Sequence, residues 1–447
     1  FIAFTRLLPR DENAESQLLI ANADGSSPRV LFTSNALALA FPRFSPDGAK
    51  IAVAQFSFAA NQSTNVVIVS RGKEQPHFIA VENGQPSSVI WLAGGEEIVF
   101  TRFESVTNVR SAPGTIVRHH LRKGTSRVLY SVPSAGRVID LLPGGRIVSD
   151  VPLWRQNLRE HPLRGSGQAR WLTRGSCVDR QPSLSPDGEW IIFSSDRAGN
   201  LDLWTLSRKT GAVRRITDDA ADDWDPAYTH DGKEILWSSN RSGHFEIWIA
   251  DADGSGARQL TKDGFDAENP TISRADVIVY TSVNPRAPGI WRINRDGSDA
   301  RRIVPGILIH PEMSPDGEWV LYHQATATDD ETYAARIRDG RVFRLAGGYA
   351  GEGGAVNVVG IGRGRWMPDG RQFVVVGRDD QSRFGVYVQD FDPERDTSST
   401  RRKLAGFDPE HPTESLGFVP DGSAIVLSEL EPLSVISIAE GLTGLTR

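Results

Sequence analysis

Polar side chains recur at fixed intervals along this chain, and they are its best candidates for binding chemistry. Four of them stand directly before a proline, namely Gln181, Asp225, Asn269 and His310. Further acidic residues and one tryptophan lie close by in the sequence, namely Asp179, Asp223, Trp224, Asp266 and Glu268. Carboxylate, amide and imidazole groups together accept and donate hydrogen bonds and attract cations. The set therefore predicts a ligand or partner site that is acidic on one side; the alternative is that these groups only cap strand ends and contact solvent.

The prolines belong to a repeat whose clearest part is the turn Ser-Pro-Asp-Gly. Intact copies stand at residues 45–48, 185–188 and 314–317, and degenerate copies fill the intervals. The third turn positions fall at 47, 94, 144, 187, 231, 275, 316, 369 and 421, so the period is 41 to 53 residues. Proline presets φ for the first central position, while Asp and Gly accept the other conformations of a tight turn. A period of this length is typical of a four-stranded propeller blade.

Short apolar runs between the turns have the pattern of β-strands. In one repeat they lie at residues 190–193, 201–204 and 213–216, each bounded by polar or turn-forming residues. Segments with helical periodicity of useful length are absent, so the sequence predicts an all-β chain. Residues 1–6, 17–21 and 30–33 read as second, third and fourth strands, so we expect the chain to enter in the middle of a repeat, with a segment upstream.

Nine first-strand turns plus this partial unit predict about nine to ten four-stranded antiparallel blades. We expect one propeller domain over residues 1–447, closed by pairing of the N- and C-terminal segments, because closure hides edge strands. Two smaller propellers in tandem remain the alternative.

The repeat also predicts where the candidate residues lie. A proline suits the start of a strand, so Pro182, Pro226, Pro270 and Pro311 mark the start of the innermost strand, at the mouth of the central channel. The glycine-rich segment 347–364 leads into the next innermost strand on the same face, and its Tyr349 could close over a ligand. The alternative is a merely long loop.

Other recurrent residues favour structural roles. Arg197 and Arg241 occupy the same place in two hairpins. This recurrence favours a structural role in which each guanidinium group hydrogen-bonds to loop carbonyls or to acidic side chains. Trp204, Trp248 and Trp291 recur once per blade, which favours packing between blades. Equivalent positions on neighbouring blades lie too far apart to share one ion, so we predict no metal and no cofactor.

Composition and motifs exclude several function classes. The net charge is −6 without a basic block, which argues against a nucleic-acid partner, and no apolar run is long enough to span a bilayer. A Gly-x-Ser-x-Gly elbow and a phosphate-binding glycine loop are both absent, so we expect no catalysis. The single Cys177 excludes an intramolecular disulfide and is compatible with an oxidising compartment.

The pattern Pro-x-x-Ser-Pro-Asp-Gly, an apolar strand, Ser-x-Arg-x-Gly, Ile/Leu-Trp, an Asp-Gly turn and Leu/Ile-Thr resembles the TolB-type β-propeller repeat. Its best copies are residues 182–217 and 226–261, and weaker copies cover nearly the whole chain. Segments 364–370, 385–391, 400–409 and 414–418 also resemble the propellers that follow the membrane segment of some bacterial serine/threonine kinases. The resemblance implies a bacterial, extracytoplasmic (periplasmic or cell-surface) binding propeller. Similar propellers precede prolyl-oligopeptidase hydrolase domains or act as oligogalacturonate lyases, but no hydrolase domain or clustered histidine set is found in this sequence.

These observations predict a non-catalytic propeller that binds a protein or a small molecule at the channel mouth, as an extracytoplasmic sensor or interaction module. An accessory scaffold subunit of a larger complex is the alternative, and a metal-dependent lyase is the least favoured class. A fold of this kind hosts many activities, so the repeat specifies the fold more strongly than the function.

Overall fold

The computed structural model describes residues 1–8, 15–35, 37–56, 64–72, 74–82, 84–103, 114–132, 137–325, 330–346, 363–379, 381, 383–441 and 445. These residues form antiparallel strands and one short 3-10 helix, η1 (Ser398–Thr400), so the predicted all-β class is confirmed. Their contacts divide the chain into two compact units. Unit 1 comprises residues 1–153 and 433–447, and unit 2 comprises residues 154–432.

Unit 2 contains five four-stranded sheets and four strands of a five-stranded sheet whose fifth strand belongs to unit 1; we call these blades 1 to 6. Blade 1 consists of β15 (Asp179–Leu184), β16 (Trp190–Ser195), β17 (Asp202–Ser207) and β18 (Val213–Arg215). Blade 2 consists of β19 (Asp223–Tyr228), β20 (Glu234–Ser239), β21 (Glu246–Asp251) and β22 (Arg258–Gln259). Blade 3 consists of β23 (Ala267–Ile272), β24 (Val277–Ser282), β25 (Gly289–Asn294) and β26 (Arg301–Pro305).

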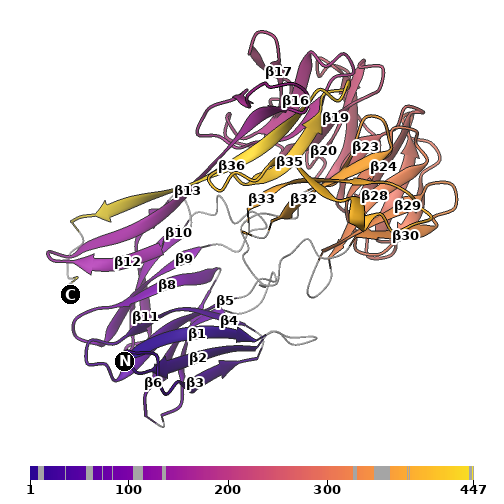
Figure 1. Cartoon of the computed structure of the whole chain (residues 1–447). Helices are drawn as coiled ribbons and strands as arrows, with labels where there is room; N and C mark the ends of the chain where they lie inside the picture. Colours follow the sequence, from indigo (N-terminus) through magenta and orange to yellow (C-terminus); the bar gives the residue numbers. More distant parts are fainter. Residues whose placement is uncertain are drawn as a thin grey trace. The chain divides into compact units, whose positions relative to one another are not determined.

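The remaining blades follow in chain order, as the colours from magenta to yellow show in Figure 1. Blade 4 consists of β27 (Ile309–Met313), β28 (Trp319–Ala325), β29 (Asp330–Arg336) and β30 (Val342–Ala346). Blade 5 consists of β31 (Arg365–Trp366), β32 (Gln372–Arg378), β33 (Phe384–Asp390) and β34 (Arg402–Gly406). Blade 6 combines both ends of unit 2 in the order β35 (Thr413–Phe418), β36 (Ala424–Ala439), β13 (Arg146–Pro162) and β14 (Arg170–Trp171).

Buried apolar clusters join each blade of unit 2 to the next. Ile192 of blade 1 packs with Trp237 of blade 2, and further clusters join blades 2 and 3, 3 and 4, 4 and 5, and 5 and 6. The sixth cluster brings Leu158 and Val426 of blade 6 against Phe193 of blade 1. Each blade therefore buries both faces against neighbours, and the six sheets form a ring.

Unit 1 contains four sheets. The first consists of β1 (Ile2–Leu8), β2 (Glu15–Ala21) and β3 (Arg29–Ser34), and the second of β4 (Ala38–Phe44), β5 (Lys50–Phe56), β6 (Thr64–Ser70) and β7 (His77–Val81). The third consists of β8 (Gln85–Trp91), β9 (Glu97–Phe103), β10 (Gly114–His120) and β11 (Thr125–Val132). The fourth consists of β12 (Arg137–Leu142) with parts of β13 and β36. Three apolar clusters join them in succession. Within the described ranges no such cluster joins the first sheet to the fourth, so these sheets form an open series.

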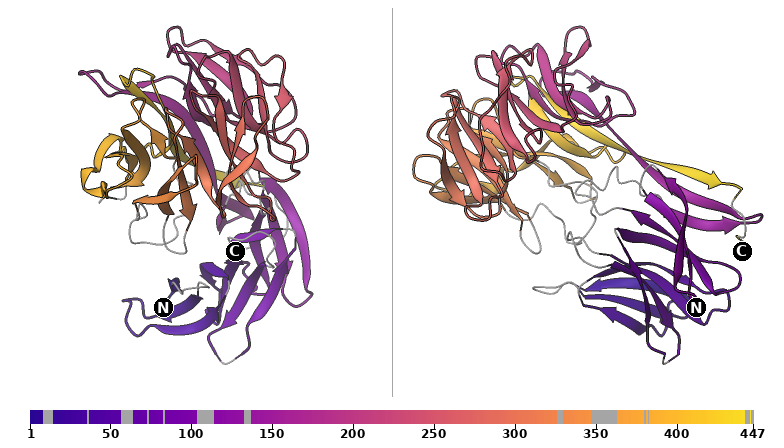
Figure 2. Two further views of the ribbon diagram at one scale, coloured as in Figure 1. Left: turned by 90° about the vertical axis from the view of Figure 1, so that its right-hand side faces the viewer. Right: turned by 180° about the vertical axis from the view of Figure 1, so that it is seen from behind.

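The two long strands β13 and β36 each contribute residues to both units. β13 is the second strand of the last sheet of unit 1 up to residue 153 and the third strand of blade 6 from residue 154. β36 is the second strand of blade 6 up to residue 432 and continues into unit 1 beyond it. Figures 1 and 2 show the two strands side by side.

The expected closure by pairing of the chain termini is not confirmed. β1 pairs with β2, whereas β36 lies between β13 and β35. The contacts also divide the expected single domain into two units. The repeat period identifies blades but carries no information on which blade closes on which, because every blade offers the same apolar faces.

The turn motif behaves as its chemistry predicts, since all nine predicted turns join the first strand of a sheet to the second. In the copy at residues 185–188 the Gly188 amide donates to the Ser185 carbonyl at 2.8 Å, and Gly188 has φ +71°. The Ser185 hydroxyl accepts the Trp190 amide at 2.9 Å, while Asp187 Oδ1 accepts the Glu189 amide at 2.9 Å. The turn thereby satisfies its own backbone groups.

Candidate functional site

The four residues before the prolines share one unusual backbone conformation. Gln181, Asp225, Asn269 and His310 have φ values of 57°, 56°, 59° and 53°. The pairing of each innermost strand with the second strand shifts at this point, which marks a β-bulge. Left-handed backbone costs free energy in non-glycine residues. Its recurrence shows that the bulge belongs to the blade design and re-aims one side chain per blade.

Two further blades supply a residue at the same position. Each of the four bulge residues stands four positions before the first residue of its turn, and the same count gives Arg363 in blade 5 and Ser415 in blade 6. We call these six residues the axial ring: Gln181, Asp225, Asn269, His310, Arg363 and Ser415. Sequence reasoning missed the last two because no proline follows them; counting back from the turn would have found both.

Hydrogen bonds connect neighbouring members of the axial ring. The Gln181 amide donates to Ser415 Oγ at 2.9 Å, which links blade 1 to blade 6. The Asp225 amide donates to Gln181 Oε1 at 3.1 Å, and the Asn269 side-chain amide donates to the Asp225 carboxylate. The sequence placed Gln181, Asp225 and Asn269 at equivalent positions, and the structure brings them together.

An ion pair crosses the ring between Arg363 and Asp225. These residues belong to blades 5 and 2, which are separated by two blades on either side, so the pair lies across the ring axis. Asp225 is 3% exposed and Arg363 is 8% exposed. A buried pair of this kind needs both partners, because the loss of one leaves an uncompensated charge.

Two more ion pairs flank the axial ring. Arg180 of blade 1 contacts Glu414 of blade 6 at 2.5 Å, and Arg365 of blade 5 contacts Glu312 of blade 4 at 2.9 Å. Burial raises the pKa of Glu312, and the Arg365 guanidinium opposes this shift. Each of these pairs joins adjacent blades.

Glu268 is the acid with the most perturbed environment near the axis. Burial is the main cause that raises the pKa of Glu268 to about 8, and the negative charges of Asp225 and Asp266 add to it. The positive charge of Arg363 acts in the opposite direction. The carboxyl group is therefore mostly protonated at neutral pH. A pKa displaced this far is frequent at functional sites, although structural networks produce it as well.

His310, another member of the axial ring, is held neutral. Burial, followed by the charge of Arg363, lowers the pKa of His310 well below its ordinary value. Its Nδ1 is buried without a hydrogen-bond partner. The ring of His323 lies 6.3 Å away; burial lowers the pKa of His323 to about 4, and its Nε2 accepts the Gly364 amide at 3.1 Å. Neither imidazole carries a charge at neutral pH.

Asp179 and Asp223 contact arginines of their own blades. Both are fully buried. Arg197 Nη2 donates to Asp179 at 2.6 Å, and Arg241 Nη2 donates to Asp223 at 2.9 Å. The contacts with acids that were expected of Arg197 and Arg241 are confirmed.

The other predicted residues lie near the axis or outside the described chain. Trp224 stacks on Phe245 with ring centroids 4.7 Å apart. Asp266 is half-buried, and its Oδ1 accepts the Phe245 amide at 3.0 Å. Tyr349 falls outside the described residues, so its predicted part in a lid stays a prediction.

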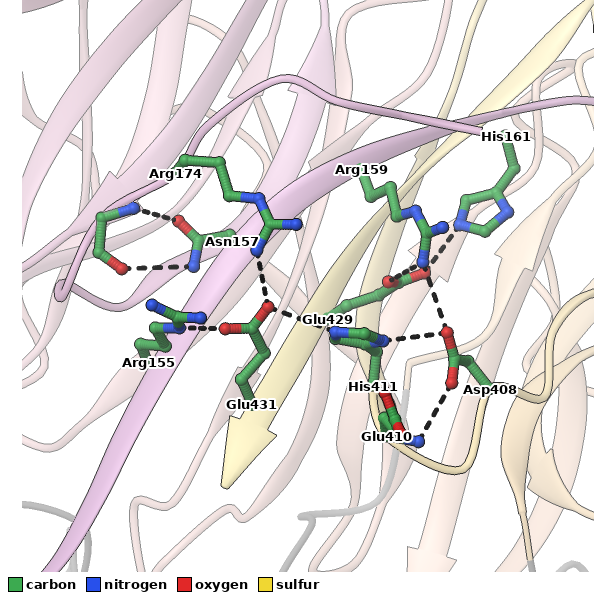
Figure 3. Close-up of polar contacts among 11 residues, drawn as sticks. Arg155, Asn157, Arg159, His161, Arg174, Asp408, Glu410, His411, Glu429 and Glu431 are labelled. Atoms are coloured by element: carbon green, nitrogen blue, oxygen red, sulfur yellow. Dashed lines mark hydrogen bonds and ion pairs between the residues drawn. The ribbon is translucent and has the colours of Figure 1, made fainter. Parts of the chain in front are cut away.

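A second polar cluster holds blade 6 together, as Figure 3 shows. Strand β13 contributes Arg159 and His161, which contact the fully buried Glu429 of β36 at 3.2 Å and 2.6 Å. Arg174 contacts Glu431 at 2.8 Å. These pairs join the N-terminal and C-terminal strands of unit 2, so side-chain charges support the sheet that completes the ring.

His411 joins the loop between blades 5 and 6 to the same cluster. Its Nδ1 lies 2.8 Å from Asp408, and its Nε2 lies 3.2 Å from Glu431 (Figure 3). We assign this cluster to ring closure rather than to ligand binding, because its carboxylates are occupied by strand and loop residues.

No group of three or more His, Cys, Asp or Glu side chains in the described part of the chain could hold a metal ion. The same part contains no helix long and apolar enough to cross a membrane.

Comparison with known proteins supports the fold. Residues 163–306 match the model of the TolB beta propeller domain, which confirms the TolB-type repeat where its best copies were predicted. The chain is similar in structure to TolB from Acinetobacter baumannii, with 16% identity, 76% of this chain and 78% of that chain covered, and a TM-score of 0.34. It is also similar to an oligogalacturonate lyase from Vibrio parahaemolyticus, with 12% identity, 96% of this chain and 97% of that chain covered, and a TM-score of 0.40. A third similar structure is a gluconolactonase from Xanthomonas campestris, with 15% identity, 66% of this chain and 94% of that chain covered, and a TM-score of 0.41.

Proposed function

We propose that this protein is a non-catalytic binding propeller whose ligand or protein partner contacts the axial ring of unit 2. The observation that carries this proposal is the convergence of left-handed bulge residues from successive blades on one hydrogen-bonded, charged cluster. Strained backbone in non-glycine residues is frequent at sites that present side chains to a ligand.

The chemistry of the ring suits recognition more than catalysis. Its arginines are engaged by carboxylates, and both of its nearby imidazoles are neutral. A catalytic base needs a pKa near the working pH and a position beside a reacting group. The neutral histidines lack the former, whereas Glu268, whose pKa is about 8, is an acid near the axis that meets it. We further propose an extracytoplasmic sensor or interaction module, with which the single cysteine of the sequence is compatible.

The test is a binding screen with defined immobilised peptides and oligosaccharides, followed by calorimetry on every probe that binds. Removing both charges of the crossing pair, in the variant Asp225→Asn/Arg363→Gln, should weaken binding by roughly tenfold to a hundredfold, as for central residues of a binding surface. Replacing both partners avoids an unpaired buried charge.

The matched control is Arg336→Gln/Asp339→Asn. It makes the same chemical change at an exposed ion pair in the hairpin between β29 and β30. Equal binding by the wild type and the axial variant, with loss of binding in the control, would overturn the proposed site.

A further inference from the structure

The charges around the axis leave one acid without a cation. Arg180 pairs with Glu414, Arg363 with Asp225, and Arg365 with Glu312, so each of these arginines is matched. The carboxylate of Glu268 has neither a hydrogen bond nor an ion pair within the residues that the structure describes. Among the described residues near the axis, each of the three arginines pairs with one acid, whereas Glu268 has no such pair.

The surroundings of Glu268 reinforce this deficit. Asp225 and Asp266 are the acidic neighbours that act on its carboxylate, and Arg363 is the basic one. The positive charge of Arg363 is already engaged by Asp225, and the nearby His310 is neutral. Glu268 is only half-buried, so part of its side chain is open to solvent.

We propose that Glu268 binds the positively charged group of a ligand, an ammonium or a guanidinium, at the axis of unit 2. This inference rests on the proposed function and names the ligand chemistry of the same site. The half-buried carboxylate of Glu268 supplies the counter-charge. A divalent metal is less suitable, because such ions need several oxygen ligands and no such set occurs among the described residues.

Binding of a cation at this position is coupled to the loss of a proton. With a pKa of about 8, Glu268 is mostly neutral at pH 7 and mostly ionised at pH 9. Only the ionised form pairs with a cation, so the apparent affinity should rise by about tenfold between these two values. At pH 7, each binding event should release nearly one proton to the buffer.

The experiment uses n-butylguanidinium as the probe and n-butanol as its neutral counterpart, because a guanidinium keeps its charge throughout this pH range. Amide resonances of residues 268 and 269 in the full chain are followed by NMR at pH 7 and pH 9. We expect saturable shifts with the guanidinium, about tenfold tighter at pH 9, and none with butanol. Glu268→Gln should abolish both the binding and its pH dependence.

The control variant is Glu246→Gln in β21. Burial also raises the pKa of Glu246, but its carboxylate is engaged by Thr261 and by the Gly264 amide. This variant should bind the probe as the wild type does. Unchanged binding in Glu268→Gln, or equal affinity at both pH values, would overturn the proposal, as would the absence of shifts at saturating probe.

A second arm separates this proposal from the proposed function and separates a free amine from a protein side chain. Peptides that carry Lys, Arg or Gln at one position are compared on the wild type and on Glu268→Gln. Binding without preference for Lys or Arg leaves the proposed function standing and removes this inference. Binding of the guanidinium alone, with no peptide or oligosaccharide bound, supports the cation site and contradicts the broader proposal.

Discussion

At the scale of single residues, the axis of unit 2 is organised by charge pairing. Arg363 reaches Asp225 on the opposite blade, and both side chains are almost fully buried. This burial makes the pairing important for stability, because an isolated charge in a dry environment is costly.

Replacing one partner of this pair should therefore be costly. We expect Arg363→Gln to lower the free energy of unfolding by about 3–5 kcal/mol, because Asp225 is left buried and unpaired. The double variant Asp225→Asn/Arg363→Gln should recover part of this loss. Urea unfolding of the two single variants and the double variant measures the coupling; additive losses would contradict an interaction between the two side chains.

Glu268 gives a prediction for the pH dependence of stability. Its pKa is about 8 in the folded protein, above the ordinary value of 4.5, so the folded state binds more protons than the unfolded state between these values. Stability should fall as pH rises through this window. Glu268→Gln should therefore raise the melting temperature at pH 9 and change it little at pH 4, as thermal unfolding would show; an equal change at both pH values would argue against the raised pKa.

At the scale of elements, close approach of neighbouring innermost strands fixes the spacing of the blades. Gly417 of β35 lies where an added Cβ would overlap the Pro182 carbonyl oxygen of β15. This contact lies at the junction between blades 6 and 1, where the two ends of unit 2 meet. Glycine is required there for space rather than for backbone conformation.

Gly417→Ala should separate the two strands and lower the free energy of unfolding by about 1–3 kcal/mol. Gly94→Ala is a matched control, because a Cβ at Gly94 meets no atom within 4 Å. Denaturant unfolding of both variants compares the two positions. Equal stability of the two would show that the junction relaxes without cost.

At the scale of the whole molecule, one strand pair serves two units. The C-terminal parts of β13 and the N-terminal part of β36 complete blade 6, and their other parts belong to unit 1. The polar cluster around Glu429 and Glu431 joins the two strands by side-chain contacts. Ring closure in unit 2 therefore depends on segments far apart in the sequence.

A fragment of residues 154–432 should fold alone, because it contains all four strands of blade 6. A fragment of residues 179–432 lacks β13 and β14 and leaves Glu429 without its partners Arg159 and His161. We expect the longer fragment to unfold cooperatively by circular dichroism and the shorter one to be much less stable. Similar stability of both fragments would refute the closing role of β13.

The sequence by itself determined the strand pattern, the nine turns and the equivalence of Gln181, Asp225, Asn269 and His310, because these depend on local turn chemistry and on alternation along a strand. Tertiary structure alone decided the partition into two units, because identical apolar faces do not specify which blades meet. It also decided which partner each acid has. Asp179 and Asp223 occupy positions close to that of Asp225 in the repeat, yet they are bound by arginines of their own blades. Arg363 was recognisable only by counting within the repeat, and its partner across the axis depends on six blades closing into a ring.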